Sequence, residues 1–316
     1  MFVILLATYN GEKYIEEQLQ SIVTQSLDDW FLLVCDDGSS DSTIKLVEKY
    51  VASYPSKVKL ITNTSNNHGA KNNFFYLLEN APQGDYYVFC DQDDVWSNDK
   101  LQTLLDEYKN HDSLTPMLIY HDLQIVDQDL NVLSQSFGDY TDLRLNLNEP
   151  IYDLIKYNYI PGCAMSFNHA LKSIIKFGGD GINIHDWWVI LICASFGKIY
   201  SVERSLTLYR QHTSNTIGIM PKAHGFGLIK RYLSVEKFKK VFSMLRKAKR
   251  DSYNILEELK LAYGDSLDVN TVKLIEDNMR YMSSKNKLSA LIWGMKKQNR
   301  QSGLLKNIYY WTSKLR

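Results

Sequence analysis

The sequence has few cysteines, and none of them belongs to a recognisable metal or redox motif. The four cysteines, Cys35, Cys90, Cys163 and Cys193, are far apart, and no C-x-x-C pair occurs. This usage argues against a zinc site and against a disulfide framework. It indicates reduced core residues in a protein of the cytosol.

The sequence also lacks a long apolar run. The longest such stretch, Trp187–Ala194, is far shorter than the roughly 18 residues that a membrane-spanning helix needs. The run Phe2–Ala7 is too short for the apolar part of a signal peptide and has no basic flank. We therefore expect a globular protein with neither a secretion signal nor a membrane span.

The formal net charge of the chain is zero, but the charged residues are unevenly distributed. Residues 222–316 contain 21 basic and 8 acidic residues, a net charge of +13, whereas residues 1–221 carry −13. Such asymmetry predicts two functional parts, of which the basic one faces an anionic surface.

Short apolar runs alternate with helical patterns along the chain. A repeat of strand and helix about every 30 residues predicts a doubly wound α/β domain with a mainly parallel sheet. The expected strands are 2–8, 31–35, 58–62, 86–90, 117–120, 163–167, 199–202 and 206–209. The expected helices of this part are 12–24, 43–52, 71–79, 100–108, 170–176 and 186–194.

Two stretches differ from this pattern. Residues 122–150 are rich in turn residues and form either an excursion on one side of the sheet or a flexible loop. After residue 221 the pattern is that of basic amphipathic helices. These are expected at about 226–262, 270–282, 286–298 and 303–315.

Three carboxylates, Asp91, Asp93 and Asp94, directly follow the strand expected at 86–90. Ligands of open α/β sheets bind at the carboxyl ends of the strands. Because the three acids repel one another, a divalent cation is the economical counter-charge, and hard cations prefer carboxylate oxygens. The alternative is a solvated acidic turn that caps the helix beginning near Lys100.

Other polar residues are expected at the same edge of the sheet. Thr8, Asn10 and Glu12 stand at the end of the first strand, and Asp36 and Asp37 end the second. A carboxylate there can accept a hydrogen bond from a base or a ribose, although a turn with a helix cap is the alternative. The chain has neither G-x-x-x-x-G-K-[ST] nor G-x-G-x-x-G. A diphosphate at this edge would therefore need a metal ion.

Two later residues stand where elements begin or end. Asp186 opens the helix at 186–194, where it is either a helix cap or a general base whose pKa is raised by the flanking aromatic residues. His212 follows the strand at 206–209. It is either structural or a partner of a metal or a phosphate.

Five motifs occur in a suitable order: Ala7-Thr8-Tyr9-Asn10-Gly11, Asp36-Asp37-Gly38-Ser39-Ser40-Asp41-x-Thr43, Asp91-Gln92-Asp93-Asp94-Val95-Trp96, His185-Asp186-Trp187 and Arg210-Gln211-His212. Together they resemble the family 2 inverting glycosyltransferases of the GT-A fold. The third and fourth motifs look most like those of bacterial rhamnosyltransferases of cell-wall and capsular polysaccharide assembly. The resemblance covers about residues 1–220. The family often has Glu-Asp in place of His185-Asp186, which leaves the role of His185 open.

The resemblance implies a GT-A catalytic domain over residues 1–221, with a donor half of about 1–115 and an acceptor half of about 116–221. The basic helical region 222–316 would follow it. Nucleotide or donor contacts are implied for Thr8, Asn10, Glu12, Asp36, Lys71 and Asp91, with Asp36 meeting the pyrimidine base.

The remaining roles concern the metal and the acceptor. Asp93 would hold Mg²⁺ or Mn²⁺ against the diphosphate, and His212 would complete that site. Asp186 would be the general base. The acceptor side would be formed by His185, and by Trp96 and Trp187 as apolar walls.

The implied reaction is a single displacement that transfers L-rhamnose from dTDP-L-rhamnose to a lipid-linked saccharide. The alternatives are a UDP-hexose donor and a catalytically silent scaffold that binds nucleotide sugars in a polysaccharide assembly complex. A metal-dependent nucleotidyltransferase would normally carry a basic, glycine-rich phosphate loop near its N-terminus, which this chain lacks.

The basic helices, with their interleaved aromatic residues, predict peripheral binding to the anionic inner face of the cell membrane. The alternatives are a helical subdomain that packs on the α/β domain and an interface between copies of the chain. No nucleic-acid recognition motif occurs, so nucleic acid is not an expected partner.

Overall fold

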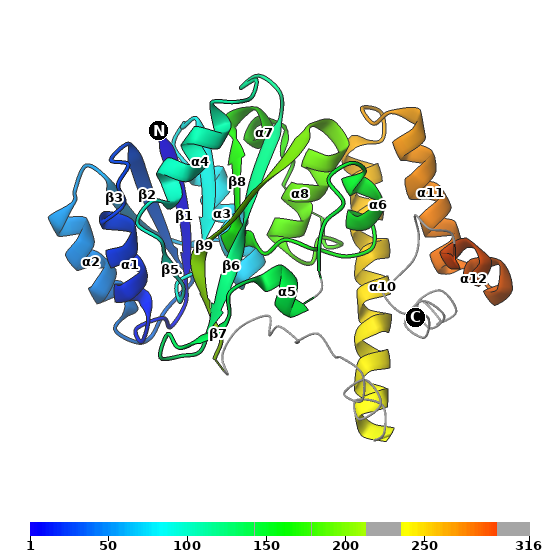
Figure 1. Ribbon diagram of the computed structural model, residues 1–316, viewed down its shortest axis with the longest axis horizontal. Helices are drawn as coiled ribbons and strands as arrows, with labels where there is room; N and C mark the ends of the chain where they lie inside the picture. The colour runs from blue at the N-terminus through cyan, green and yellow to red at the C-terminus, as the bar shows by residue number, and fades with distance from the viewer. Residues whose placement is uncertain (142, 178, 213–234, 296–316) are drawn as a thin grey trace.

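The computed structural model describes residues 1–141, 143–177, 179–212 and 235–295, which form an α/β domain with helices packed at one end (Figure 1). The boundary expected at residue 221, the start of the helix expected at 226–262 and the helix expected at 303–315 lie outside these residues. None of the described helices is long and apolar enough to cross a membrane.

The first half of the sheet is parallel, as predicted. The strands pair in the order β3-β2-β1-β4. Because the order reverses between β1 and β4, the carboxyl ends of these two strands flank the point where open α/β sheets bind ligands. The elements are β1 (Phe2–Thr8), α1 (Ile15–Val23), β2 (Trp30–Asp36), α2 (Thr43–Ser53), β3 (Val58–Thr62), α3 (Ala70–Asn80), β4 (Tyr86–Cys90), β5 (Val95–Trp96) and α4 (Lys100–Tyr108).

The second half of the sheet mixes parallel and antiparallel pairs. β8 runs antiparallel to β4 and β6, whereas β9 runs parallel to β6 and antiparallel to β5. The elements are β6 (Met117–Val126), β7 (Val132–Ser134), α5 (Phe137–Thr141), α6 (Pro150–Leu154), η1 (Gly162–Ala164), β8 (Met165–Asn168), α7 (His169–Ile174), α8 (His185–Phe196) and β9 (Lys198–Arg210). Within the stretch 122–150, residues 122–126 belong to β6 of the sheet, and β7 and α5 follow.

The two strands expected at 199–202 and 206–209 are in fact one strand of 13 residues, β9. The exposed Glu203 and Arg204 interrupt its apolar pattern, which caused the error. A shift of register opposite His121 and Asp122 lets β9 continue along β6 past this interruption.

Both faces of the sheet are covered by helices. In β1, Phe2, Ile4 and Leu6 pack in one hydrophobic cluster with α1 and α4, whereas Val3 and Leu5 pack in another with α3 and α8. All five side chains are buried. This alternation explains why the central strands are continuous apolar runs.

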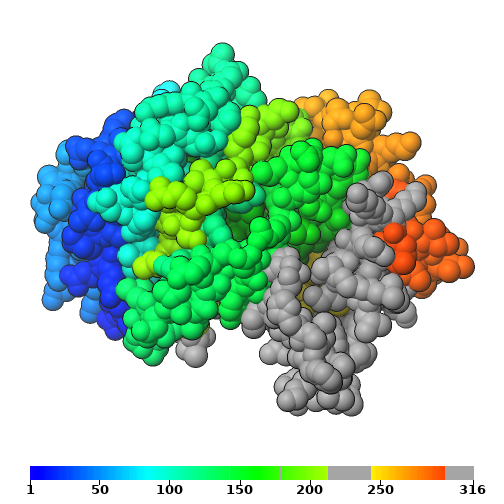
Figure 2. Space-filling model, in the orientation of Figure 1, coloured from blue at the N-terminus to red at the C-terminus, as the bar shows by residue number. Residues whose placement is uncertain are grey.

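Three C-terminal helices, α10 (Val235–Tyr263), α11 (Val269–Ser283) and α12 (Lys287–Met295), extend the molecule beyond α8. In Figures 1 and 2, α11 and α12 lie at the opposite end of the molecule from α2. Ile255, Leu256 and Leu259 of α10 are fully buried in the same cluster as α3 and α8. This part of α10 therefore packs on the α/β domain, which was one of the alternatives left open above.

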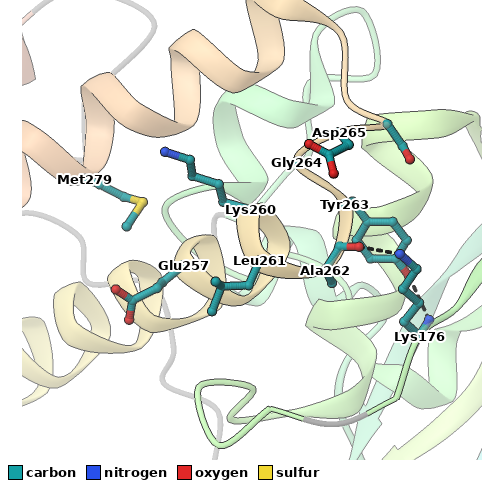
Figure 3. Close-up of a pocket in the computed structure, with 10 residues that line it drawn as sticks. Lys176, Glu257, Lys260, Leu261, Ala262, Tyr263, Gly264, Asp265 and Met279 are labelled. Carbon is teal, nitrogen blue, oxygen red and sulfur yellow. Dashed lines mark hydrogen bonds between the residues drawn. The ribbon is translucent and has the colours of Figure 1, made fainter.

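Polar contacts complete this junction (Figure 3). The hydroxyl of Tyr263 donates to the carbonyl of Ile174 and accepts from the backbone N–H of Lys176, both at 2.7 Å. A pocket of about 490 Å³ lies beside it, lined by the end of α10, by Lys176 and by Met279 of α11. None of the predicted site residues lines this pocket.

Replacing Tyr263 by phenylalanine should lower the free energy of unfolding by about 1 kcal/mol, because it removes two partly buried hydrogen bonds, to Ile174 and from Lys176. Urea unfolding of the wild type and of Tyr263→Phe would measure this difference. Tyr54→Phe is the matched control, since Tyr54 lies on the surface. Equal losses of stability in the two variants would contradict the junction described here.

Candidate active site

Thr8 and Asp36 form a buried pair beneath the loops that follow β1 and β2. The Thr8 hydroxyl donates to Asp36 Oδ2 at 3.0 Å, and Asp36 also accepts from the hydroxyl of Ser39 at 2.6 Å and from the N–H groups of Gly38 and Ser39 at 3.0 and 2.8 Å. A carboxylate has about four lone-pair sites, so both oxygens are fully used. The geometry therefore does not support the predicted contacts of Asp36 with a base and of Thr8 with the nucleotide. Both residues shape the turn.

Asn10 and Glu12 join the same two loops. Asn10 Oδ1 accepts from the N–H of Ser40 at 2.8 Å, and the N–H of Asn10 donates to the hydroxyl of Ser39 at 2.8 Å. Glu12 Oε2 accepts from the N–H of Ser42 at 2.9 Å, at the start of α2. Both side chains lie at the surface of the expected edge, and their contact with a nucleotide stays a prediction.

Asp37 anchors the loop that precedes α3. Its carboxylate accepts from the side-chain amide of Asn63 at 2.9 Å and from the N–H of Gly69 at 2.7 Å, and it lies 2.9 Å from His68 Nδ1. Gly69 has a φ of +95°, a conformation that favours glycine. Lys71, the second residue of α3, is thereby held at the same edge. Its approach to a diphosphate stays a prediction.

Asp93 and His212, which are far apart in the sequence, lie together. Asp93 Oδ2 is 2.8 Å from His212 Nε2, and the imidazole stacks on the ring of Tyr14 with 4.9 Å between the ring centroids. Both side chains are largely buried. The pair predicted to hold a metal ion is thus assembled, although the binding of an ion stays a prediction.

Asp91 and Asp94 share a second cluster with the thiol of Cys163. One potential ligand atom from each residue lies within 4.8 Å of the others. Burial and the neighbouring charges of Asp93 and Asp186 raise the pKa of Asp91 to about 7. Burial, with the charges of Asp93 and Asp91, raises the pKa of Asp94 well above its usual range. The strand end therefore holds more acid than it can keep ionised without compensation.

Arg210 supplies part of that compensation, and the sequence analysis assigned it no role. It is buried, its Nε donates to the carbonyl of Asp93 at 2.7 Å, and its own N–H donates to Asp94 Oδ1 at 3.1 Å. Its guanidinium also pairs with Glu17 and lies 4.5 Å from the ring centroid of Tyr14. A lone cation at a strand end two residues before His212 was the signal that could have identified it.

The donor atoms at this edge fit a hard divalent cation. Carboxylate oxygens and one imidazole suit Mg²⁺ or Mn²⁺ better than a soft metal. Burial and the charges of Asp94 and Asp91 raise the pKa of the Cys163 thiol well above its usual range. Because a thiol binds metals as the thiolate, Cys163 is not suited to be a ligand here.

Asp186 lies in the first turn of α8 and is buried. Its Oδ2 accepts from the N–H of Gly162 at 2.9 Å and its Oδ1 from the N–H of Trp187 at 2.6 Å. The N-cap position belongs to Ile184, so Asp186 is not the helix cap that was the alternative. Burial raises the pKa of Asp186 to about 7, although these hydrogen bonds lower it.

The aromatic residues predicted to contact the acceptor lie in the core. His185 stacks on Phe74 with 3.9 Å between the ring centroids, and burial lowers its pKa to about 3. Trp187 is 5% exposed, with its indole N–H donating to the carbonyl of Leu154 at 2.6 Å, and Trp96 is 4% exposed. These side chains are as buried as Asp186, and their contact with an acceptor stays a prediction.

Comparison with known proteins shows the family of this chain. Residues 3–172 match the family model of glycosyl transferase family 2. The chain belongs to this family. It is 30% identical over 228 residues to a dTDP-rhamnosyl transferase, RfbG, of Shigella flexneri. The aligned region covers 67% of this chain and 73% of that protein.

Solved structures show the same fold. The TarS fragment 1–349 of S. aureus in complex with UDP superposes with a TM-score of 0.55 and 16% identity, covering 98% of this chain and 90% of that one. A mannosyltransferase of Pyrobaculum calidifontis in complex with GDP-Man and Mn²⁺ gives a TM-score of 0.54 and 15% identity, with 96% and 76% covered. The fold is therefore GT-A, as the motifs implied.

The raised pKa of Asp186 predicts how the stability of the protein changes with pH. This prediction can be tested without measuring activity. The folded protein keeps the Asp186 proton up to about pH 7, whereas the unfolded chain releases it near the ordinary pKa of 3.8. Unfolding therefore releases a proton between about pH 4 and pH 7, and this group destabilises the fold increasingly as pH rises.

The stability of Asp186→Asn relative to the wild type should accordingly increase from about pH 4 to pH 7 and level off above. Urea unfolding of both proteins at several pH values measures this difference. Asp106→Asn, at an exposed position of α4, is the control and should show no such rise. A difference between Asp186→Asn and wild type that is independent of pH would contradict the raised pKa.

Proposed function

We propose that this glycosyltransferase inverts the anomeric centre and transfers L-rhamnose from dTDP-L-rhamnose to a hydroxyl of a lipid-linked cell-wall or capsular polysaccharide. The observation that carries the mechanism is the buried carboxylate of Asp186, whose pKa is raised to about 7 and whose charge acts on Asp91 in the acidic cluster. The donor sugar is supported by the five motifs and by the relative named a dTDP-rhamnosyl transferase.

Asp186 acts as the general base. An acceptor hydroxyl is a poor nucleophile until its proton is removed, and a base with a pKa near the working pH does this best. The hydroxyl oxygen bonds to the anomeric carbon while the bond from that carbon to the diphosphate breaks, and the proton passes to Asp186. One base suffices for this displacement, in contrast to the two carboxylates of a glycosidase.

Asp93 and His212 would hold a divalent cation, either Mg²⁺ or Mn²⁺. Such an ion, when bound, neutralises negative charge on the leaving nucleoside diphosphate. Arg210 keeps the backbone of Asp93 in place through its 2.7 Å hydrogen bond. Asp91 faces the donor from the same strand end, while Asn10, Glu12 and Lys71 line the nucleotide side.

Transfer or hydrolysis of a panel of nucleotide sugars by the purified protein tests this function. We expect selective turnover of dTDP-L-rhamnose that is lost with a chelator and restored by Mg²⁺ or Mn²⁺. Asp186→Asn should lose about 10²–10⁴-fold in turnover, the usual contribution of a general base, and still bind nucleotide. Asp93→Ala should lose the metal-dependent part of donor affinity, measured by calorimetry, whereas the surface variant Asp106→Ala should behave as the wild type.

Each other outcome changes a defined part of the proposal. Turnover of a UDP-hexose in place of dTDP-rhamnose would keep the mechanism and reject the donor. Near-normal turnover by Asp186→Asn would reject it as the base. Nucleotide binding without turnover of any donor, even with lipid-linked acceptors added, would favour a silent scaffold of an assembly complex.

We also propose that the protein binds the anionic inner face of the cell membrane through α12. Leu288, Ile292 and Met295 form an exposed apolar row along this helix, with exposed fractions of 68%, 60% and 41%. Lys285 and Lys287 stand at its start, in a region of net positive charge. An apolar row with adjacent lysines suits an anionic lipid surface, where a lipid-linked acceptor would be available.

Replacing Leu288 and Ile292 by serine should lower binding to phosphatidylglycerol-containing vesicles by at least about tenfold, because two apolar side chains that would insert into the lipid are lost. Co-sedimentation with vesicles measures this binding. Leu261→Ser, at an equally exposed position of α10, is the control. If the double variant binds vesicles like the wild type but loses self-association in analytical ultracentrifugation, α12 is an interface between copies of the chain and the membrane proposal is wrong.

A further inference from the structure

Lys100, the first residue of α4, is fully buried, which is rare for lysine. Its ammonium is held by neutral groups from three different elements. Nζ donates to the carbonyl of Cys163 in η1 and to the hydroxyl of Thr207 in β9, both at 3.0 Å, and lies 3.9 Å from the ring centroid of Trp96 in β5. One side chain thus joins α4, β5, β9 and η1 beneath the candidate site.

The segment η1 touches both parts of the candidate site. On one side, the N–H of Gly162 donates to Asp186 Oδ2 at 2.9 Å. On the other side, the thiol of Cys163 lies in the cluster with Asp91 and Asp94. The position of η1 therefore sets the spacing between the proposed base and the acidic strand end.

The contact between η1 and the start of α8 leaves no free space. A Cβ atom at Gly162 would lie 2.9 Å from His185 Nε2 and 3.4 Å from Asp186 Cβ. The first separation is shorter than real Cβ contacts, and the second is an ordinary van der Waals contact. A displacement of η1 would therefore be passed on directly to Asp186.

We propose that Lys100 is a positioning residue for glycosyl transfer, which holds η1 through the carbonyl of Cys163 so that Gly162 keeps Asp186 in place. This inference rests on the proposed role of Asp186 as base. A methionine would fill the same space without the cost of burying a charge. It could not donate to Cys163 and Thr207 at once, as the ammonium does.

Burial lowers the pKa of Lys100 to about 8, while the charges of nearby groups, including Asp94 and Asp91, raise it. The side chain is therefore mainly protonated at neutral pH, with three N–H groups to donate. Two of these N–H groups donate to Cys163 and Thr207.

Lys100→Met tests the inference. We expect kcat to fall by about 10–100-fold, since small displacements of a catalytic group cost factors of this size, while the KM for the donor changes less than about threefold. The melting temperature should stay equal or rise, because a buried charge is removed.

Thr207→Val removes one of the two acceptors and should give a smaller loss of kcat. Thr207→Ser keeps the hydroxyl and should have the wild-type kcat. Lys109→Met, at an exposed position after α4, is the matched control.

Hydrogen exchange of peptides covering residues 158–166 gives a measurement that needs no transfer activity. Exchange of this segment should be faster in Lys100→Met and unchanged in Lys109→Met. Unchanged exchange, an unchanged kcat, or a loss of kcat that only follows a lower melting temperature would overturn the inference. If the wild type turns over no donor, the proposed function fails, and the exchange measurement still decides whether Lys100 holds η1.

Discussion

The burial of like charges at the carboxyl end of β4 is the constraint on which the site depends. Asp91, Asp93 and Asp94 follow one another at the end of a strand that is apolar on both faces. Carboxylates in such a place repel one another and lose hydration. The protein compensates with two buried cations, Arg210 and Lys100, which reach the cluster from β9 and α4.

The two cations compensate in different ways. Arg210 fixes the backbone of Asp93 and leaves the carboxylate turned toward His212. Lys100 binds no carboxylate oxygen of the cluster that the structure records; it holds the carbonyl of Cys163 and stabilises the acids from a distance. Within the cluster, Asp93 Oδ2 lies 2.8 Å from His212 Nε2 and Asp94 Oδ1 accepts from the backbone N–H of Arg210.

The elements and their order followed from local pattern, whereas several site roles did not. β1, β3, β4 and α4 have the predicted ends because apolar periodicity and turn residues are local properties. The saturation of Asp36 is a property of how four groups from two loops meet, and no spacing reveals it. The burial of Trp96 and Trp187 depends likewise on which helices cover them. A motif thus identifies a residue that matters without showing whether it meets the ligand or supports a neighbour.

The C-terminal helices illustrate the same limit at a larger scale. A basic amphipathic pattern predicted helices after residue 221. The described part of this region contains the helices α10, α11 and α12. The pattern could not show what each apolar face contacts. Ile255, Leu256 and Leu259 pack on the α/β domain, while Leu288 and Ile292 stay exposed. The first face is thus used for folding, whereas Leu288 and Ile292 leave apolar surface exposed on α12.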